Sequence, residues 1–553
     1  MNISVSLNVS VNVFNYLSKL SRSISSSFCS FRWFAYLLGF SLSLSLSLGL
    51  GVAHLSPARS APIPVAQTLA PTVANRASAA QGTNPQKTGQ PGRQQQEFTD
   101  LPPQHYTDLT FPPLPDITLP NYDRRQLDNG LVIYLVEDHE LPLVQGTALL
   151  RVGDRWEPAE KAGLGSLTGQ LLRGGGTQQR SFEEINTFLE DRAAAIETAI
   201  NVTAGQASFS ALTEDLDPVL ALFVEILRQP AFDPDRLDLA KRQAAGNITR
   251  RNDNPQSITG REFQKLLYGA DSPYAWTVEY QTLAAIDRPD LVNFYTTYIQ
   301  PDRLILGISG DFDPQTLWPK LEQLLGDWQS TAQPQPPLPP VQPHNQGQFF
   351  TINQPQMTQS YIQLGQLGGT LDSPDYPALS VLNEVLNGLG GRLPNQIRSR
   401  QGLAYSVYSY WRPNYDFPGT FVAGGQTRTE ATLPFLMAVR SEIEAVRVTP
   451  ITEEELQFAK DVVLNSFVFG FQSPSQTLSR LMTYEYYGYP ADFVFQYQRS
   501  IATVTTADVQ RVAQTYLQPE QWVTLVVGNI EAIAADLQEW GTPQAIDITI
   551  PEP

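Results

Sequence analysis

The sequence predicts an α+β protein built from two tandem homologous units of about 200 residues, each a mainly antiparallel sheet covered by helices. Strands and helices follow one another without the regular βαβ rhythm of a parallel sheet. The segment YIQPDRLILGISGDF, which starts at Tyr298, returns as YLQPEQWVTLVVGNI at Tyr516. The pair Ala240–Lys241 returns as Ala459–Lys460 at nearly the same offset, 219 residues against 218. Two segments that recur at nearly one offset indicate that a whole unit was duplicated.

Local patterns predict the elements of the first unit. Alternating or apolar runs predict strands at 130–138 and 145–153 and a hairpin at 196–212. Apolar residues at helical spacing predict helices within 163–177, 181–195, 214–230 and 233–255. Ser181 begins the second of these helices, because Glu184 three residues later completes a capping box.

Charge and cysteine content exclude several classes of function. The formal net charge is -18, and residues 1–61 contribute +4, so the remaining chain carries -22. Such an acidic body repels phosphate backbones, and no nucleic-acid partner is expected. The single cysteine is Cys29, so the body has neither a disulfide nor a thiolate metal ligand.

The N-terminal segment, residues 1–61, predicts export. Residues 33–53 carry no charge over 21 positions, and Lys19, Arg22 and Arg32 precede them. Small residues follow, which is the pattern of a secretory signal. The run is also long enough to span a bilayer, so membrane anchoring through residues 33–53 remains an alternative to cleavage. Either outcome places the body outside the cytoplasm, in the periplasm or anchored at the membrane.

Two breaker-rich segments divide the rest of the chain. Residues 62–118 are rich in Pro and Gln and predict a disordered tether. Residues 329–348 hold proline pairs that exclude a regular helix or central strand, and they predict a linker. The prediction is therefore an N-terminal domain at 119–328 and a C-terminal domain at 349–553.

The stretch GLGSLTGQLLRGGGT, from Gly163 to Thr177, predicts a well-formed helix with little chemistry on it. Four leucines lie on one face, and the other face offers only Ser166, Gly169 and Gln170.

Three segments together resemble the pitrilysin, insulinase and mitochondrial processing peptidase family of zinc metallopeptidases. They are DNGLVIYLVEDHELPLVQGTALLRVGDRWEPAEKAGLGSLTGQLLRGGGT, DLVNFYTTYIQPDRLILGISGDF and GGRLPNQIRSRQGLAYSVYS. The resemblance covers about residues 120–545 in order. It implies that both domains are peptidase-like and that the two units form one half of a clam-shell.

In active members of this family, the helix after AGL carries an inverted motif, HxxEH, and a third ligand, a glutamate, lies 77 positions further on. By resemblance, Ser166 and Gln170 stand at the histidine positions, Gly169 at the catalytic glutamate and Asn247 at the third ligand. A hydroxyl and two amides are poor zinc ligands, and glycine cannot transfer a proton. The resemblance therefore implies a degenerate site with no metal. His139, at a strand end, and His344, in the linker, have no ligand spacing and are expected to be structural or solvated.

The second unit keeps a different part of the family pattern. By resemblance, Arg398 and Tyr405 match a pair that holds the substrate backbone and the carbonyl under attack in active members. The residues alone favour another interpretation, in which Arg398 lies on a solvated helix face and Tyr405 packs in a strand. At Ser399 the sequence departs from the glutamate that is common in the family.

The resemblance thus implies a non-catalytic, substrate-holding subunit of an exported heterodimeric zinc peptidase that acts on unfolded peptides. A homologous partner subunit would carry HxxEH and the zinc. Two alternatives remain: a structural scaffold without a catalytic contribution, and a peptide-binding protein that works alone.

Overall fold

The computed structural model describes residues 119–331, 334–388, 390–471 and 473–552, and the described residues belong to one compact unit. The predictions for residues 1–61 and 62–118 lie outside this part of the chain. No helix within the described residues is both long and apolar enough to cross a membrane.

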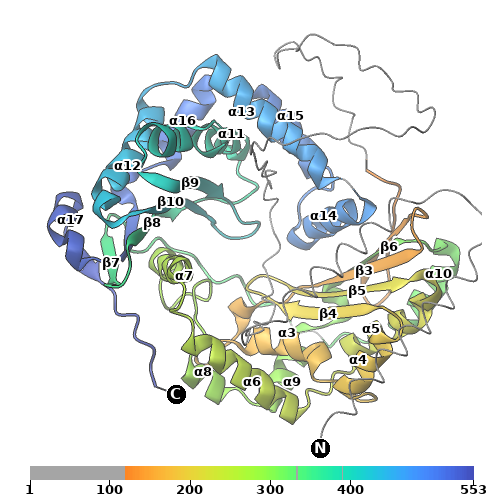
Figure 1. The fold of residues 1–553 in the computed structure, drawn as a ribbon. Helices are drawn as coiled ribbons and strands as arrows, with labels where there is room; N and C mark the ends of the chain where they lie inside the picture. Colours follow the sequence, from red (N-terminus) through yellow and green to blue (C-terminus); the bar gives the residue numbers. More distant parts are fainter. Residues whose placement is uncertain (1–118, 332–333, 389, 472, 553) are drawn as a thin grey trace, which may run out of the picture. The chain divides into compact units, whose positions relative to one another are not determined.

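Two six-stranded sheets form the framework (Figure 1). The first has the order β1 (Asp123–Gln126), β2 (Val132–Glu137), β6 (Leu304–Gly310), β3 (Leu143–Leu150), β5 (Gly205–Leu212), β4 (Ala195–Ile200). The second has the order β12 (Gln544–Ala545), β7 (Phe349–Asn353), β11 (Val523–Gly528), β8 (Gln359–Leu367), β10 (Thr420–Arg428), β9 (Ala404–Arg412).

The two sheets repeat one topology. In the first, β2 and β6 run parallel, whereas β3, β5 and β4 pair antiparallel. In the second, β7 and β11 run parallel, whereas β8, β10 and β9 pair antiparallel. The predicted α+β fold of two homologous, mainly antiparallel units is therefore confirmed.

Helices follow the strands in the same order in each unit. In the first unit they are α3 (Leu164–Gly174), α4 (Phe182–Glu190), α5 (Leu216–Arg228), α6 (Pro234–Thr249), α7 (Pro255–Tyr268), α8 (Tyr280–Ala285), α9 (Arg288–Tyr298) and α10 (Pro314–Leu325). In the second they are α11 (Tyr376–Asn387), the π-helix η6 (Pro394–Arg400), α12 (Thr432–Val448), α13 (Glu453–Ser466), α14 (Pro474–Tyr487), α15 (Phe493–Thr503), α16 (Thr506–Tyr516) and α17 (Ala534–Trp540).

Local signals explain where several helices begin. At α4, the Ser181 hydroxyl accepts the Glu184 N–H at 3.2 Å, and the Glu184 carboxylate accepts the Ser181 N–H at 2.8 Å. The predicted capping box is therefore present. The helix predicted within 163–177 is α3, and its leucines Leu164, Leu167, Leu171 and Leu172 are buried in the core.

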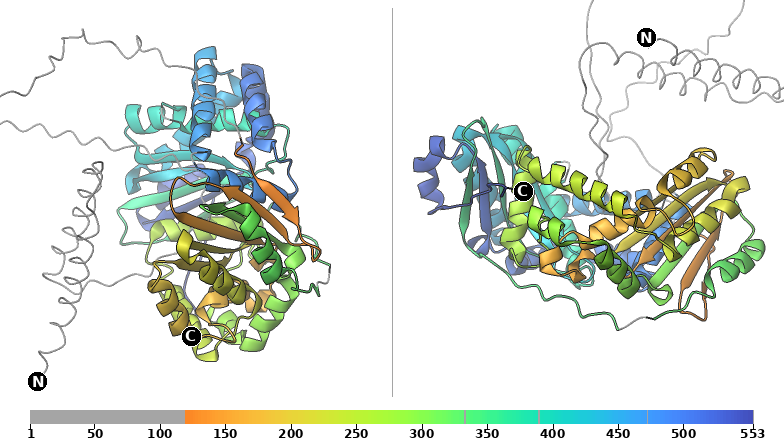
Figure 2. Two further views of the ribbon diagram at one scale, coloured as in Figure 1. Left: turned by 90° about the vertical axis from the view of Figure 1, so that its right-hand side faces the viewer. Right: turned by 90° about the horizontal axis from the view of Figure 1, so that it is seen from below.

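The two units exchange one helix each. One face of each sheet packs on its own unit's helices. On its opposite face, the first sheet is covered by α14, which packs on β2, β3 and β6 (Figure 1). In return α7 packs on β8 and β11 of the second sheet, and the view from below in Figure 2 shows this helix beside that sheet. Each sheet thus depends on a helix from the other unit.

Candidate functional site

The helix α3 is regular and capped at its N-terminus, but its exposed side chains are not metal ligands. Its N-terminus follows Gly163, and the buried carboxylate of Glu157 accepts the N–H groups of Gly163 at 2.7 Å and Gly165 at 2.8 Å. Burial raises the pKa of Glu157 to about 7, and these two N–H donors partly oppose the shift. Ser166 and Gln170 are both exposed on the outer side of α3.

Gly169 is a contact point between α3 and the edge strand β4. A Cβ atom at this position would lie 2.2 Å from the backbone nitrogen of Ile200 and 2.7 Å from the carbonyl carbon of Ala199. Real Cβ atoms do not approach backbone so closely, so glycine lets the helix and the strand pack together. Gly169 is therefore held to glycine by backbone packing, whatever chemistry the position is expected to lack.

Asn247 is the residue expected, by the resemblance, at the position of the third ligand. It is exposed on α6, which packs against α3. A zinc ion requires imidazole, thiolate or carboxylate donors, and Ser166, Gln170 and Asn247 offer a hydroxyl and two amides. Among the described residues no three His, Cys, Asp or Glu side chains lie together as metal ligands. The residues at this site do not fit a zinc ion.

His139 contacts two carboxylates of the first unit. Its Nδ1 lies 2.5 Å from Asp311 and its Nε2 lies 2.7 Å from Glu137, so both ring nitrogens face carboxylates. The hydrogen bond with Asp311, and next that with Glu137, raise the pKa of His139. With both ring nitrogens bound to carboxylates, His139 has no free nitrogen for a metal.

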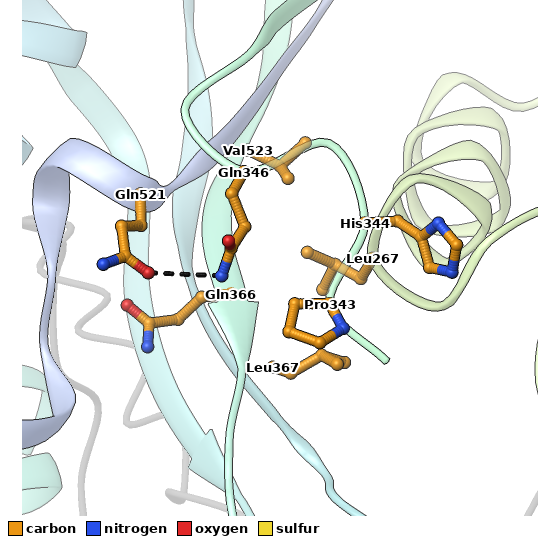
Figure 3. A pocket seen from close by; sticks show the side chains of 8 residues that line it. All are labelled: Leu267, Pro343, His344, Gln346, Gln366, Leu367, Gln521 and Val523. Carbon is orange, nitrogen blue, oxygen red and sulfur yellow. Dashed lines mark hydrogen bonds between the residues drawn. The ribbon is translucent and has the colours of Figure 1, made fainter. Parts of the chain in front are cut away.

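His344 borders a small cavity between α7 and the second sheet. The cavity measures about 60 Å³, and at one side of it the Gln346 side chain donates a hydrogen bond to Gln521 at 3.2 Å (Figure 3). Its lining residues are Leu267, Pro343, His344, Gln346, Gln366, Leu367, Gln521 and Val523. This volume has room for a few ordered water molecules, and the glutamine side chains that line it offer them hydrogen bonds.

Arg398 lies on an irregular helix that points it outward. Residues Pro394–Arg400 form a π-helix, a rare form that occurs often at functional sites. Ile397 is fully buried, whereas the neighbouring Arg398 is exposed. The N–H of Leu403 donates to the carbonyl of Ile397 at 3.0 Å and closes the segment.

Tyr405 lies at a break in the ladder between β9 and β10. Ser406 pairs with Gln426 and Ala404 pairs with Thr427, which leaves Tyr405 without a partner residue on β10. Such a bulge redirects a side chain, and Tyr405 is 92% exposed.

The structure thus places Arg398 and Tyr405 on two elements, η6 and β9, that pack against each other. Within the described part of the chain, neither side chain has a hydrogen-bond or ion-pair partner. Arg398 offers a fork of N–H donors and Tyr405 a hydroxyl, both free to bind a carbonyl or a carboxylate.

Sequence reasoning missed two ion pairs near these elements. Arg392, just before η6, makes a bidentate pair with Glu455 at 2.8 and 2.9 Å. Arg155 pairs with Asp416 at 2.8 Å across 261 residues. No local pattern could predict these pairs, because the partners lie far apart in the sequence. Arg392 itself stands in the segment GGRLPNQIRSRQGLAYSVYS, but its partner Glu455 does not.

The fold and the site define a class: a duplicated α+β protein whose described residues hold no metal-binding triad at α3. Family models agree with this description. Residues 137–270 match the insulinase model of peptidase family M16, and residues 285–463 match the peptidase M16 inactive domain. The chain belongs to peptidase family M16.

Curated relatives cover most of the described chain. An uncharacterized zinc protease of Mycobacterium leprae is 27% identical over 382 residues, 65% of this chain and 81% of that protein. The non-peptidase homolog YmxG of Helicobacter pylori is 22% identical over 410 residues, 72% of this chain and 91% of that protein.

Solved structures share the fold. A peptidase M16 inactive domain from Pseudomonas fluorescens matches with a TM-score of 0.65 at 24% identity, covering 74% of this chain and 98% of that one. The periplasmic protease PqqL from Escherichia coli matches with a TM-score of 0.64 at 16% identity, covering 76% of this chain and 48% of that one.

Proposed function

We propose that this chain is the non-catalytic, substrate-holding subunit of an exported heterodimeric zinc peptidase that acts on unfolded peptides. One observation carries the proposal: two backbone irregularities, a π-helix and a β-bulge, expose Arg398 and Tyr405 without internal partners. Because neither side chain is engaged within the described part of the protein, both are available to a ligand, and exposed tyrosine and arginine are the residue types that interfaces favour.

The pair suits a peptide that is being cleaved. The Arg398 guanidinium donates parallel hydrogen bonds to backbone carbonyls, and the Tyr405 hydroxyl donates to a carbonyl oxygen as it gains negative charge. The homologous partner would supply the zinc site, since Ser166, Gln170 and Asn247 cannot. An unfolded peptide is the expected substrate because only an extended chain exposes its backbone to both side chains.

The export part of the proposal rests on the sequence. The uncharged run 33–53 with its basic flank supports secretion, and the related periplasmic protease PqqL is consistent with it.

The decisive experiment mixes the chain with a homologue from the same organism that carries HxxEH. Peptide cleavage should appear that neither chain shows alone. Arg398→Ala and Tyr405→Phe should each lower turnover about 100- to 1000-fold, as loss of one oxyanion donor does, and should leave assembly intact. Peptide cleavage rates and size-exclusion profiles measure the two effects.

Matched controls exist on the same two elements. Arg400 is exposed on η6 beside Arg398, and Tyr410 lies on β9 five residues after Tyr405. Arg400→Ala and Tyr410→Phe should leave turnover within about twofold of wild type, as surface changes away from the chemistry do.

Other outcomes select the alternatives. If both site variants assemble and cleave at the wild-type rate, the chain is a scaffold. If the chain binds peptide tightly as a monomer and no homologue activates cleavage, it is a stand-alone peptide-binding protein.

A further inference from the structure

The strand β9 directs part of its side chains toward the core of the second unit. Ala404 and Val407 belong to this core, Ser409 is buried, and Trp411 packs against the core. The interval from Ala404 to Val407 is one residue longer than the alternation of a strand requires, because the bulge at Tyr405 adds a residue. The remaining side chains of β9, which begin at Tyr405, therefore point away from the core.

These outward side chains end in a stack of three groups. The rings of Tyr408 and Tyr410 stack with their centres 5.3 Å apart, and the guanidinium carbon of Arg412 lies 4.3 Å from the centre of the Tyr410 ring. The Tyr408 hydroxyl accepts a hydrogen bond from the Gln363 amide of β8 at 3.3 Å. The stack is therefore anchored to the sheet at Tyr408, and its other end is the exposed Arg412.

Arg412 has no carboxylate partner among the described residues. Its side chain makes neither an ion pair nor a hydrogen bond in that part of the chain, whereas Arg428 of the neighbouring strand β10 pairs with Glu430 at 3.0 Å. Stacking on a ring orders a guanidinium and leaves the N–H groups at its edge free to donate. Because the protein carries a net charge of -18, most of its surface repels a carboxylate, and an ordered, unpaired guanidinium attracts one.

The edge of β9 beside the stack is closed to an added strand. The Ser409 N–H donates to the Asn387 side chain at 3.1 Å, and the Trp411 N–H donates to the Asn383 side chain at 2.9 Å. Both asparagines belong to α11, and they occupy the donors that an edge strand otherwise offers to a peptide backbone. A peptide that reaches this end of β9 must therefore be bound by side chains.

We propose that Arg412 is a specificity-determining residue of the substrate-holding site and binds an acidic side chain of the extended peptide. This inference rests on the proposed role of Arg398 and Tyr405. At about 3.3 Å per residue, the strand from Tyr405 to Arg412 spans about 23 Å. An extended peptide covers this distance in about seven residues, and with the reach of the side chains the preferred acid lies about five to nine residues from the scissile bond.

Binding of labelled peptides to the full chain alone tests the preference. An unstructured peptide with blocked ends and a single glutamate as its only charge should bind about 3- to 10-fold more tightly than its glutamine counterpart, as expected for a partly exposed charged hydrogen bond. Arg412→Gln should abolish this difference, and Arg412→Glu should reverse it in favour of the matching lysine peptide. Added salt should weaken the preference. Fluorescence anisotropy measures the dissociation constants.

Arg428→Gln is the matched control. It removes an exposed arginine from the last position of β10, as Arg412→Gln does from the last position of β9, and it should keep the wild-type preference. Equal binding of the glutamate and glutamine peptides to the wild-type chain would overturn the inference, and so would a glutamate preference that survives Arg412→Gln.

Cleavage with the zinc-bearing partner separates this inference from the proposed function. A glutamate about five to nine residues from the cut should lower KM and leave kcat within about twofold, because a contact far from the cut is equally strong in the ground and transition states. If Arg412 sets the preference but Tyr405→Phe cleaves at the wild-type rate, the acid-binding role stands and the catalytic contribution of Tyr405 fails. If Tyr405→Phe loses turnover but the glutamate has no effect at any position, the substrate-holding role stands and the acid-binding role fails.

Discussion

At the scale of single residues, two glycines in helices of the first unit have opposite surroundings. A Cβ at Gly169 would collide with the backbone of β4, whereas one at Gly246, on α6, meets nothing within 4 Å. We expect Gly169→Ala to lower the free energy of unfolding by about 1–3 kcal/mol, the cost of overpacking. Gly246→Ala should raise it by about 0.5–1 kcal/mol, because alanine loses less backbone entropy in a helix. Urea unfolding of both variants measures the difference, and equal effects would contradict the close contact of α3 with β4.

A second residue-scale prediction concerns Glu157. Burial raises its pKa to about 7, and burial, with Glu157 nearby, also raises the pKa of Asp154. The folded protein therefore binds more protons than the unfolded chain above about pH 4.5. Stability should fall as the pH rises from about 5 through 7, with a slope of up to about 1.4 kcal/mol per pH unit for each proton.

Glu157→Gln should flatten this slope, whereas Glu160→Gln, an exposed neighbour, should leave it unchanged. His139 adds a decline of the same sign, since its folded pKa is also raised. Unfolding free energies at several pH values provide the measurement, and a Glu157→Gln slope equal to that of wild type would contradict the assignment.

At the scale of elements, the two lysines at matching positions of the units, Lys241 and Lys460, make the same kind of contact. The Lys241 ammonium donates to the carbonyl of Ile286 at 2.8 Å, and the Lys460 ammonium donates to the carbonyl of Val504, also at 2.8 Å. Each bond joins a helix, α6 or α13, to the end of a later helix in the same unit. Lys241→Met and Lys460→Met should each cost about 1–3 kcal/mol, because a carbonyl loses a charged donor.

Arg242→Met is the matched control for the lysine variants. Arg242 is the exposed neighbour of Lys241 on α6, and its replacement should change stability by less than about 0.5 kcal/mol. Thermal unfolding compares the three variants. If one lysine variant is strongly destabilised and the other is not, the two units share the lysine but not its contribution to stability.

The elements also show how far local sequence reasoning extends. Strands β2 and β3, the β4–β5 hairpin and helices α3 to α6 follow from periodicity and capping. The bulge at Tyr405 and the π-helix at Arg398 could not be predicted, since both arise from strand register and packing against the core. Gly169 could be matched to the position of a lost glutamate, but its contact with Ile200 depends on how β4 returns to α3.

At the scale of the whole molecule, long-range contacts determine which sheet each helix covers, and the sequence does not predict them. Nothing in the pattern of α7 or α14 distinguishes a helix that covers its own sheet from one that covers the other. The exchange appears only in the packing: Leu478, Leu481 and Met482 of α14 lie against Val132 and Ile305 of the first sheet. The Glu485 side chain on the same helix reinforces this contact by accepting hydrogen bonds from Arg124 and Tyr134 of the first sheet.

The exchange predicts that the two units cannot separate. We expect a chain cut by an inserted protease site within 334–340, where the structure has neither helix nor strand, to remain one particle with a single unfolding transition. Fragments 119–328 and 349–553 made separately should bind hydrophobic dyes and aggregate, and should recover only when refolded together.

The size of the buried apolar surface explains this expectation. Burying a large apolar side chain is worth about 1.5–3 kcal/mol, so exposing even five of those beneath α14 or α7 removes an amount comparable to the 5–15 kcal/mol net stability of a typical domain. Size-exclusion chromatography and calorimetry of the cut chain measure the outcome, and the same cut in a surface loop of one unit is the control. Two independent transitions, or separation of the fragments without denaturant, would show that the exchanged helices contribute little and that each unit folds on its own.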